Sequence, residues 1–146
     1  MRILVAAFML FLAACAGPPA DIREADAAPH ADAGPGVYIV NLKTGDAVSS
    51  PFRVAFGLYG MGVAPAGTEK ENTGHHHLLV DAVLEGDELN YAIPGDEHHI
   101  HFGGGQTETV LDLPPGEHTL QLILGDLNHM PFKPSVQSER ITITVR

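Results

Sequence analysis

Apolar and polar residues alternate in short segments from Val37 onward, and this pattern limits the fold more than any other feature of the chain. In the three clearest segments the apolar positions are Phe52, Val54, Phe56 and Leu58, then Leu120, Leu122 and Leu124, then Ile141, Ile143 and Val145. A period of two is typical of strands that bury one face. Less regular segments predict further strands at 37–42, 75–84, 98–102 and 107–113.

Glycine and proline separate these segments. The breaks fall at 45–46, 65–67, 94–96, 103–105, 114–116 and 131–134. No segment has a helical period of useful length. Together these patterns predict an all-β fold of about seven strands, an antiparallel β-sandwich of immunoglobulin-like or cupredoxin-like type. A small barrel is the alternative.

The N-terminus has the features of an export signal. Arg2 is followed by an apolar run, residues 3–12, that is too short to span a bilayer. The next residues, Leu12-Ala13-Ala14-Cys15, resemble the lipobox of bacterial lipoproteins. We therefore expect residues 1–14 to be a signal peptide and Cys15 to carry lipid, including palmitate, that anchors the chain to a membrane. The alternative is an ordinary signal peptide with a chance cysteine.

Residues 15–36 are rich in Ala, Pro, Gly and Asp, which predicts a flexible tether between Cys15 and a sandwich domain at 37–146. Ala16 occupies the position at which an acidic residue retains lipoproteins in the inner membrane. By resemblance to that sorting rule, we expect an outer-membrane anchor in the cell envelope, facing the periplasm.

The charge and cysteine content exclude several classes of function. The formal net charge is −10, and removal of residues 1–14 takes away Arg2 and no acidic residue. An acidic protein of this kind is a poor partner for nucleic acid and can attract cations. Cys15 is the only cysteine, so its acylation would leave no disulfide, no thiolate metal ligand and no blue-copper site.

Histidine is the unusual residue type, because eight of the nine histidines fall between His75 and His129. If 75–84 is a strand, His76 shares a face with Leu78 and the core, whereas His75, His77 and Asp81 share the other face. In the next segment Ile100 and Phe102 mark the buried face, which leaves His99 and His101 opposite. Two strands would then each present a His-x-His pair on the side away from the core.

This spacing favours a metal site. Residues i and i+2 of a strand lie about 6.6 Å apart and point the same way, and their imidazoles can converge on one ion at about 2.0 Å. A loop after Leu124 adds His129 and Met130 as candidate ligands, and Met61 is a further loop methionine. The predicted ligands are His75, His77, His99, His101, His129, Met61 and Met130.

Copper is the favoured ion, because imidazole and thioether ligands suit it and its affinity for such sites exceeds that of the other divalent ions. Zinc is the alternative, especially if Asp81 or Glu108 joins the ligands. The predicted role is metal buffering or delivery in the cell envelope rather than catalysis.

Two other classes of function stay open. In the first, the chain is a structural or protein-binding module whose histidines are hydrogen bonded, for example to Asp81 or Glu108. In the second, His99, His101, Glu108 and His118 form a cupin-like metalloenzyme site. The six residues between His101 and Glu108 exceed the cupin spacing. His118 is in phase with Leu120, and we expect it to form hydrogen bonds at the edge of the sandwich.

Four segments, GHHHLLVD, HIHFGGGQTE, PPGEHTLQLILGD and NHMPF, resemble the bacterial family named for domain of unknown function 4399. The resemblance covers roughly residues 50–146 and implies that these histidines form one site. It implies no particular activity. The last motif of the family often ends in histidine, where this chain has Phe132, so no ligand is implied at that position.

Overall fold

The computed structural model describes residues 34–146, so the predicted signal peptide, Cys15 and most of the predicted tether lie outside the described residues. The strands are β1 (Gly36–Ile39), β2 (Ala47–Val48), β3 (Phe52–Tyr59), β4 (Gly62–Val63), β5 (Thr73–Val80), β6 (His99–His101), β7 (Glu108–Leu111), β8 (Gly116–Gly125) and β9 (Ile141–Val145). All seven predicted strands are present, and β2 and β4 are additional strands of two residues each. Within this range no helix has the length and apolar character needed to cross a membrane.

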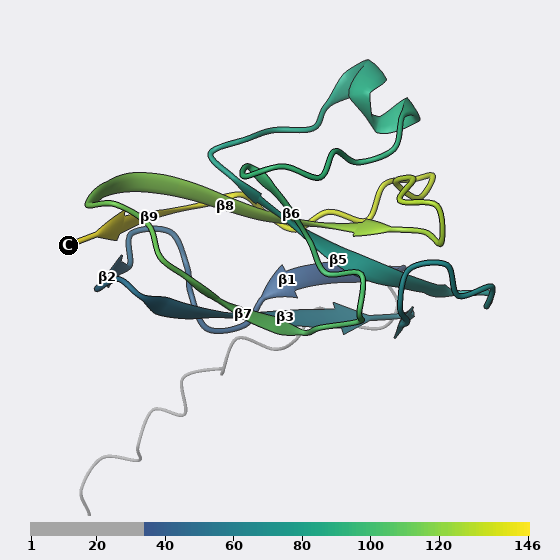
Figure 1. Cartoon of the computed structure of the whole chain (residues 1–146), viewed down its shortest axis with the longest axis horizontal. Helices are drawn as coiled ribbons and strands as arrows, with labels where there is room; N and C mark the ends of the chain where they lie inside the picture. Colours follow the sequence, from purple (N-terminus) through teal and green to yellow (C-terminus); the bar gives the residue numbers. More distant parts are fainter. Residues whose placement is uncertain (1–33) are drawn as a thin grey trace, which may run out of the picture.

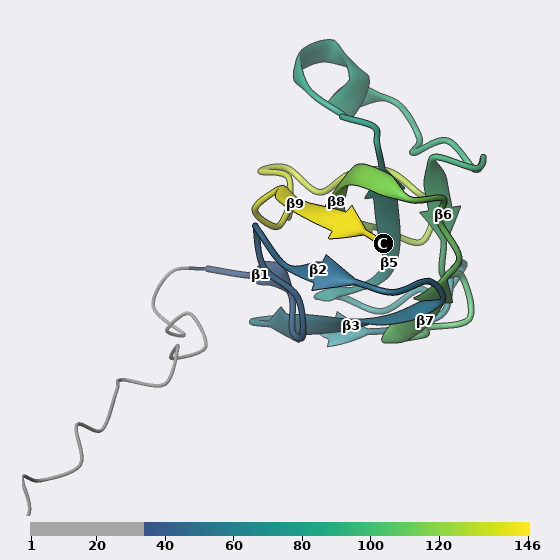
Figure 2. The ribbon, with the colours of Figure 1, turned by 90° about the vertical axis from the view of Figure 1, so that its left-hand side faces the viewer.

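The strands form two sheets that pack face to face (Figures 1 and 2). The smaller sheet has the order β1-β3-β7, and the larger has the order β2-β9-β8-β5-β4, with β6 also paired to β5. Leaving out the two short strands, the first, second and fifth strands make one sheet, and the fourth, third, sixth and seventh make the other. This is an immunoglobulin-like sandwich in which the fourth strand pairs with the third, whereas in the constant-type immunoglobulin domain it belongs to the sheet of the first, second and fifth strands. The sheets are not purely antiparallel, because β2 pairs with β9, and β4 with β5, in parallel.

The main core lies between the sheets and follows from the alternation in the sequence. On β5 and β8 the even-numbered side chains point inward, and Leu78, Leu120, Leu122 and Leu124 are fully buried there. The smaller sheet contributes inward-facing apolar residues such as Val54, which is also fully buried. Burial of aliphatic side chains of this size stabilises a fold by about 1.5–3 kcal/mol each.

The other face of β5 and β8 is also covered, which the sequence did not indicate. Residues 81–98, here called the outer loop, rise from the larger sheet on the side away from the smaller one (Figure 2). The outer loop contains a short 3-10 helix, Gly86–Asn90. Its Leu84 and Ile93 pack with Leu79 of β5 and Ile123 of β8 in a second apolar cluster.

The predicted strand 75–84 is too long, because β5 ends at Val80. Asp81 has a φ of 55°, so the chain leaves the sheet there. Its carboxylate accepts hydrogen bonds from the Thr119 amide at 2.7 Å and from Nδ1 of His118 at 2.7 Å. The hydrogen bond to Asp81 raises the pKa of His118 against the opposing effect of burial. The structure thus confirms that His118 forms hydrogen bonds at the edge of the sandwich, and it places Asp81 beyond the end of β5, where its carboxylate binds His118.

Truncation of the second apolar cluster tests whether it is a true core. Ile123→Ala removes a fully buried side chain from this cluster, and Leu122→Ala does the same in the main core. We expect each to lower the free energy of unfolding by about 2–5 kcal/mol in denaturant titrations. Val110→Ala is the control, because Val110 is 65% exposed, and its effect should stay within about 0.5 kcal/mol. If the Ile123→Ala protein were as stable as the Val110→Ala protein, the second apolar cluster would not be a true core.

Candidate metal centre

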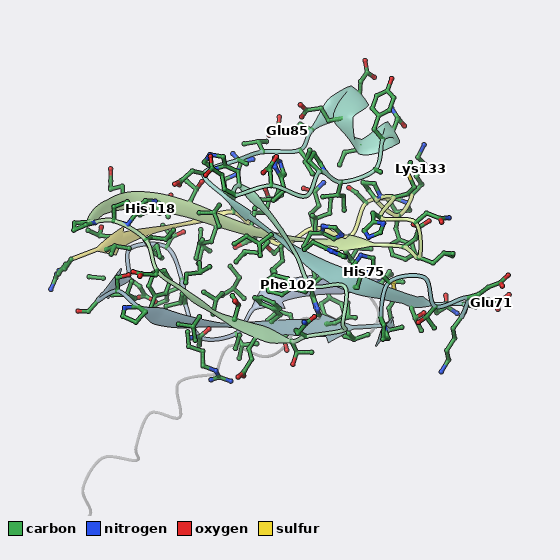
Figure 3. All side chains as sticks on the ribbon, in the orientation of Figure 1. Glu71, His75, Glu85, Phe102, His118 and Lys133 are labelled. Atoms are coloured by element: carbon green, nitrogen blue, oxygen red, sulfur yellow. The ribbon has the colours of Figure 1, made fainter. Side chains whose placement is uncertain are left out.

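The registers of β5 with its two neighbours bring the histidines together. His77 lies directly opposite His101 of β6, and His75 lies opposite Gly125 of β8. His75 and His77 are odd-numbered residues of β5, so their rings lie on the outer face of the larger sheet, next to the second apolar cluster. Figure 3 shows His75 toward the end of the molecule at which Glu71 lies, while Phe102 lies between the sheets.

The rings of His75, His77 and His101 converge. Each offers one nitrogen, and these three nitrogens all lie within 4.8 Å of one another. The Nε2 atoms of His75 and His77 are 3.0 Å apart. Both side chains are 1% exposed, whereas His101 lies on the exposed side of the cluster. The cluster is therefore closed by protein on one side and open on the other.

His129 joins the cluster from the loop after β8. Its ring centroid lies 4.7 Å from that of His101, 5.0 Å from that of His75 and 5.9 Å from that of His77. We call His75, His77, His101 and His129 the histidine cluster. The structure thus brings together four histidines from three separate segments of the chain, and their role as metal ligands stays a prediction.

Hydrogen bonds fix the loop that carries His129. Oδ1 of Asp126 accepts the amides of Asn128 at 2.7 Å and Met130 at 2.9 Å, and the Asp126 carbonyl accepts the amide of His129. His129 has a φ of 68°, a left-handed conformation that histidine adopts more readily than most residues. Its carbonyl accepts the amide of Ile93, which ties the outer loop to the histidine cluster.

Two glycines leave room for the rings. A Cβ atom on Gly125 would lie 2.9 Å from Nε2 of His77 and 3.4 Å from Cα of His129. A Cβ atom on Gly103 would overlap the ring of His101. Neither glycine has a positive φ, so the close approach of an imidazole, not the backbone conformation, requires glycine at these positions.

The buried imidazoles are held in the neutral form. Burial lowers the pKa of His75 to about 4, and His101 and His129 add to the effect against Asp126, which raises it. Burial lowers the pKa of His77 to about 3, again with neighbouring histidines contributing. The pKa of His101 is lowered by burial and by His129. Neutral imidazoles keep a free nitrogen lone pair near pH 7, which is the form that binds metal ions.

The second ring nitrogens of His75 and His77 have no hydrogen-bond partner in the protein. The Nδ1 atoms of His75 and His77 are buried and have no hydrogen-bond partner. Between them, His76 points into the main core, where its Nδ1 donates to the carbonyl of Gln106 at 3.2 Å and its ring lies against Phe56. Unpartnered buried polar atoms cost about 1–3 kcal/mol each, so the cluster is not a satisfied hydrogen-bond network.

Several predicted site residues lie elsewhere. His99 is on the predicted strand, but its Nδ1 is hydrogen bonded to Oδ1 of Asp96 at 2.8 Å and its ring is not one of the converging group. Met61 is partly buried and packs against the main core. Met130 is next to His129, and its described hydrogen bonds are those of its backbone; its role as a ligand stays a prediction.

The carboxylates considered for this site are used elsewhere. Glu108 forms an ion pair with Arg53 between β7 and β3 of the smaller sheet, and Asp81 binds His118. Neither is available to the histidine tract as a hydrogen-bond partner or as an additional zinc ligand. Glu108 is paired with Arg53, His118 with Asp81, and His101 lies with His75 and His77. The residues of the cupin-like alternative therefore do not form one site.

The geometry defines the class of protein: an immunoglobulin-like β-sandwich with a four-imidazole cluster on the outer face of its larger sheet. The chain belongs to the family described as domain of unknown function DUF4399, whose profile matches residues 54–146. No curated protein matches it. Among solved structures, it is similar to the fibronectin(III)-like modules of CbhA from Clostridium thermocellum, with 11% identity and a TM-score of 0.40. The match covers 77% of this chain and 45% of the other.

A methyl group at Gly125 tests the packing of the cluster. We expect Gly125→Ala to lower the free energy of unfolding by about 1–3 kcal/mol, because the His77 ring cannot move away without disturbing its buried neighbours. Gly95→Ala is the matched control, since nothing lies within 4 Å of its Cβ position. Denaturant titration of both variants checks this, and equal stability would show that the ring of His77 does not pack against Gly125.

Proposed function

We propose that this chain is a lipid-anchored protein of the cell envelope that binds a transition-metal ion through its histidine cluster, for buffering or delivery of the ion. The observation that carries the proposal is the convergence of three nitrogens from His75, His77 and His101 within 4.8 Å. Copper is the first candidate and zinc the alternative, because neutral imidazole suits both.

Two properties of the cluster support binding over a purely structural role. The imidazoles of His75 and His77 are neutral, and one side of the cluster is open at His101. The outer loop beside it carries six acidic residues and no lysine or arginine. One of these six, Glu85, is paired with Arg140. The negative potential of the others raises the concentration of cations near the loop.

The alternative is a structural or protein-binding module in which the histidines bind one another. The 3.0 Å separation of Nε2 atoms between His75 and His77 favours it, because one ring can donate to the other. This single hydrogen bond leaves the Nδ1 atoms of both rings unpartnered, however. A structural role alone would be served better by apolar side chains at these positions.

Metal titration separates the two functions, and β6 supplies a matched pair of variants. The test uses the tag-free mature chain carrying Cys15→Ser, so that no thiol competes. We expect one equivalent of copper or zinc to bind, and His101→Gln to weaken binding by about 10- to 100-fold or more. His99→Gln removes an imidazole two residues away that binds Asp96 instead, and it should leave affinity unchanged. Absence of binding, or equal losses in both variants, would favour the structural module.

The lipid anchor is tested separately. Wild-type protein made in a Gram-negative host should incorporate labelled palmitate and fractionate with the outer membrane. Cys15→Ser should lose the label and retain residues 1–14, because lipid attachment precedes cleavage. Ala16→Asp should keep the label and move the protein to the inner membrane. An unlabelled wild-type protein would show that the N-terminus is an ordinary signal peptide.

A further inference from the structure

The four rings of the histidine cluster are almost equally far apart. Of the six distances between ring centroids, five lie between 4.7 and 5.0 Å, and the sixth, between His77 and His129, is 5.9 Å. Four points at nearly equal distances from one another form a tetrahedron. The ring centroids are thus arranged as a tetrahedron, whereas the group whose ligand nitrogens all lie within 4.8 Å of one another is His75, His77 and His101, without His129.

These distances can be compared with those of metal complexes. With a metal–nitrogen bond of about 2.0 Å and a ring centroid about 1.1 Å beyond the nitrogen, tetrahedral imidazoles have centroids about 5.1 Å apart. A square-planar set has neighbours about 4.4 Å apart and two diagonals of about 6.2 Å. If the 5.9 Å distance were one diagonal, His75 and His101 would form the other, yet their centroids are 5.0 Å apart. The ring centroids therefore fit a tetrahedron better than a square, and a nitrogen of His129 would have to turn toward the other three to bind the same ion.

We propose that His129 is the fourth ligand of a tetrahedral site that holds copper as Cu⁺, in preference to Cu²⁺ and Zn²⁺. This inference rests on the proposed metal-binding function and specifies the ion. Cu²⁺ favours tetragonal geometry. Cu⁺ and Zn²⁺ have filled d shells and therefore bind in a tetrahedral site without loss of binding energy. The separation of 3.0 Å between Nε2 of His75 and Nε2 of His77 lies between the values of about 2.8 Å for neighbouring ligands of a square-planar ion and about 3.3 Å for a tetrahedral ion. It fits binding of both nitrogens to one ion, and the ring centroids carry the argument for the geometry.

The charge of the site distinguishes Cu⁺ from Zn²⁺. Within the described residues, the converging group contains only histidines, so the ligands bring no negative charge. Asp126 is the carboxylate that acts on His75, and its Oδ1 already accepts two backbone amides of its own loop. Transfer of an ion into a poorly solvated site costs more as its charge rises. Since His75 and His77 are 1% exposed, a single positive charge is accommodated more easily than a double one.

The geometry is tested by Co²⁺ as a spectroscopic probe on the mature Cys15→Ser chain. Tetrahedral Co²⁺ gives intense visible absorption bands, and octahedral Co²⁺ gives weak ones. We expect intense bands in the wild type and in His98→Gln, whose Nδ1 is hydrogen bonded to the Val80 carbonyl. His129→Asn should shift their wavelengths and intensities, because an oxygen ligand would replace the fourth imidazole while the ion stays four-coordinate. Asparagine tolerates the left-handed backbone there, so the loop is preserved. Weak bands in the wild type, or unchanged bands in His129→Asn, would overturn the role of His129.

The ion is tested by anaerobic competition with chromophoric chelators for Cu⁺, and by parallel titrations with Cu²⁺ and Zn²⁺. We expect Cu⁺ to bind at least tenfold more tightly than either, a difference of about 1.4 kcal/mol. His129→Asn should weaken Cu⁺ binding by at least tenfold. Tighter binding of Zn²⁺ or Cu²⁺ would overturn the assignment of Cu⁺ while leaving a metal site in place. If no ion binds the wild type, the proposed function itself fails.

Discussion

The register in which β5 pairs with its neighbours is the constraint on which the histidine cluster depends. It sets His77 opposite His101 and His75 opposite Gly125, so that three imidazoles meet beside a residue without a side chain. A slip of one residue would exchange the two faces of β5 and would bury His75 and His77 in the main core. The leucines of β5 and β8 prevent this slip, because their burial between the sheets is far more favourable in one register than in the other.

Burial connects this packing to the chemistry of the imidazoles. The outer loop and the second apolar cluster cover the face on which His75 and His77 lie, and their removal from water lowers the pKa of both rings. The fold bears an energetic cost here, because two buried nitrogens have no partner. A β-sandwich that needed only stability would place apolar residues at these positions, as it does at Leu79 and Ile123.

The sequence predicted the sandwich because alternation and turn residues are local signals, and β3, β8 and β9 carry them clearly. It also predicted that His75, His77, His101 and His129 belong together. It placed His99 in the same group, since it could not show that Asp96 lies within hydrogen-bond distance of that ring. The cover provided by the outer loop was missed because Leu84 and Ile93 are isolated apolar residues in a segment without a period.

The requirement for space was also beyond prediction, since nothing in the sequence tells Gly125 and Gly103 from ordinary turn glycines. Only the position of a ring above each backbone makes glycine necessary.

The four imidazoles differ in how firmly the backbone holds them. His75, His77 and His101 are attached to paired strands, while His129 is attached to a short turn with its amide bonded to Asp126. A ligand on a turn can swing aside without opening the sheet, so an incoming acceptor could take over one bond at a time. For an ion bound as proposed, exchange with another protein would then be fast even where equilibrium affinity is high, and the rate would be set by the four residues from Asp126 to His129.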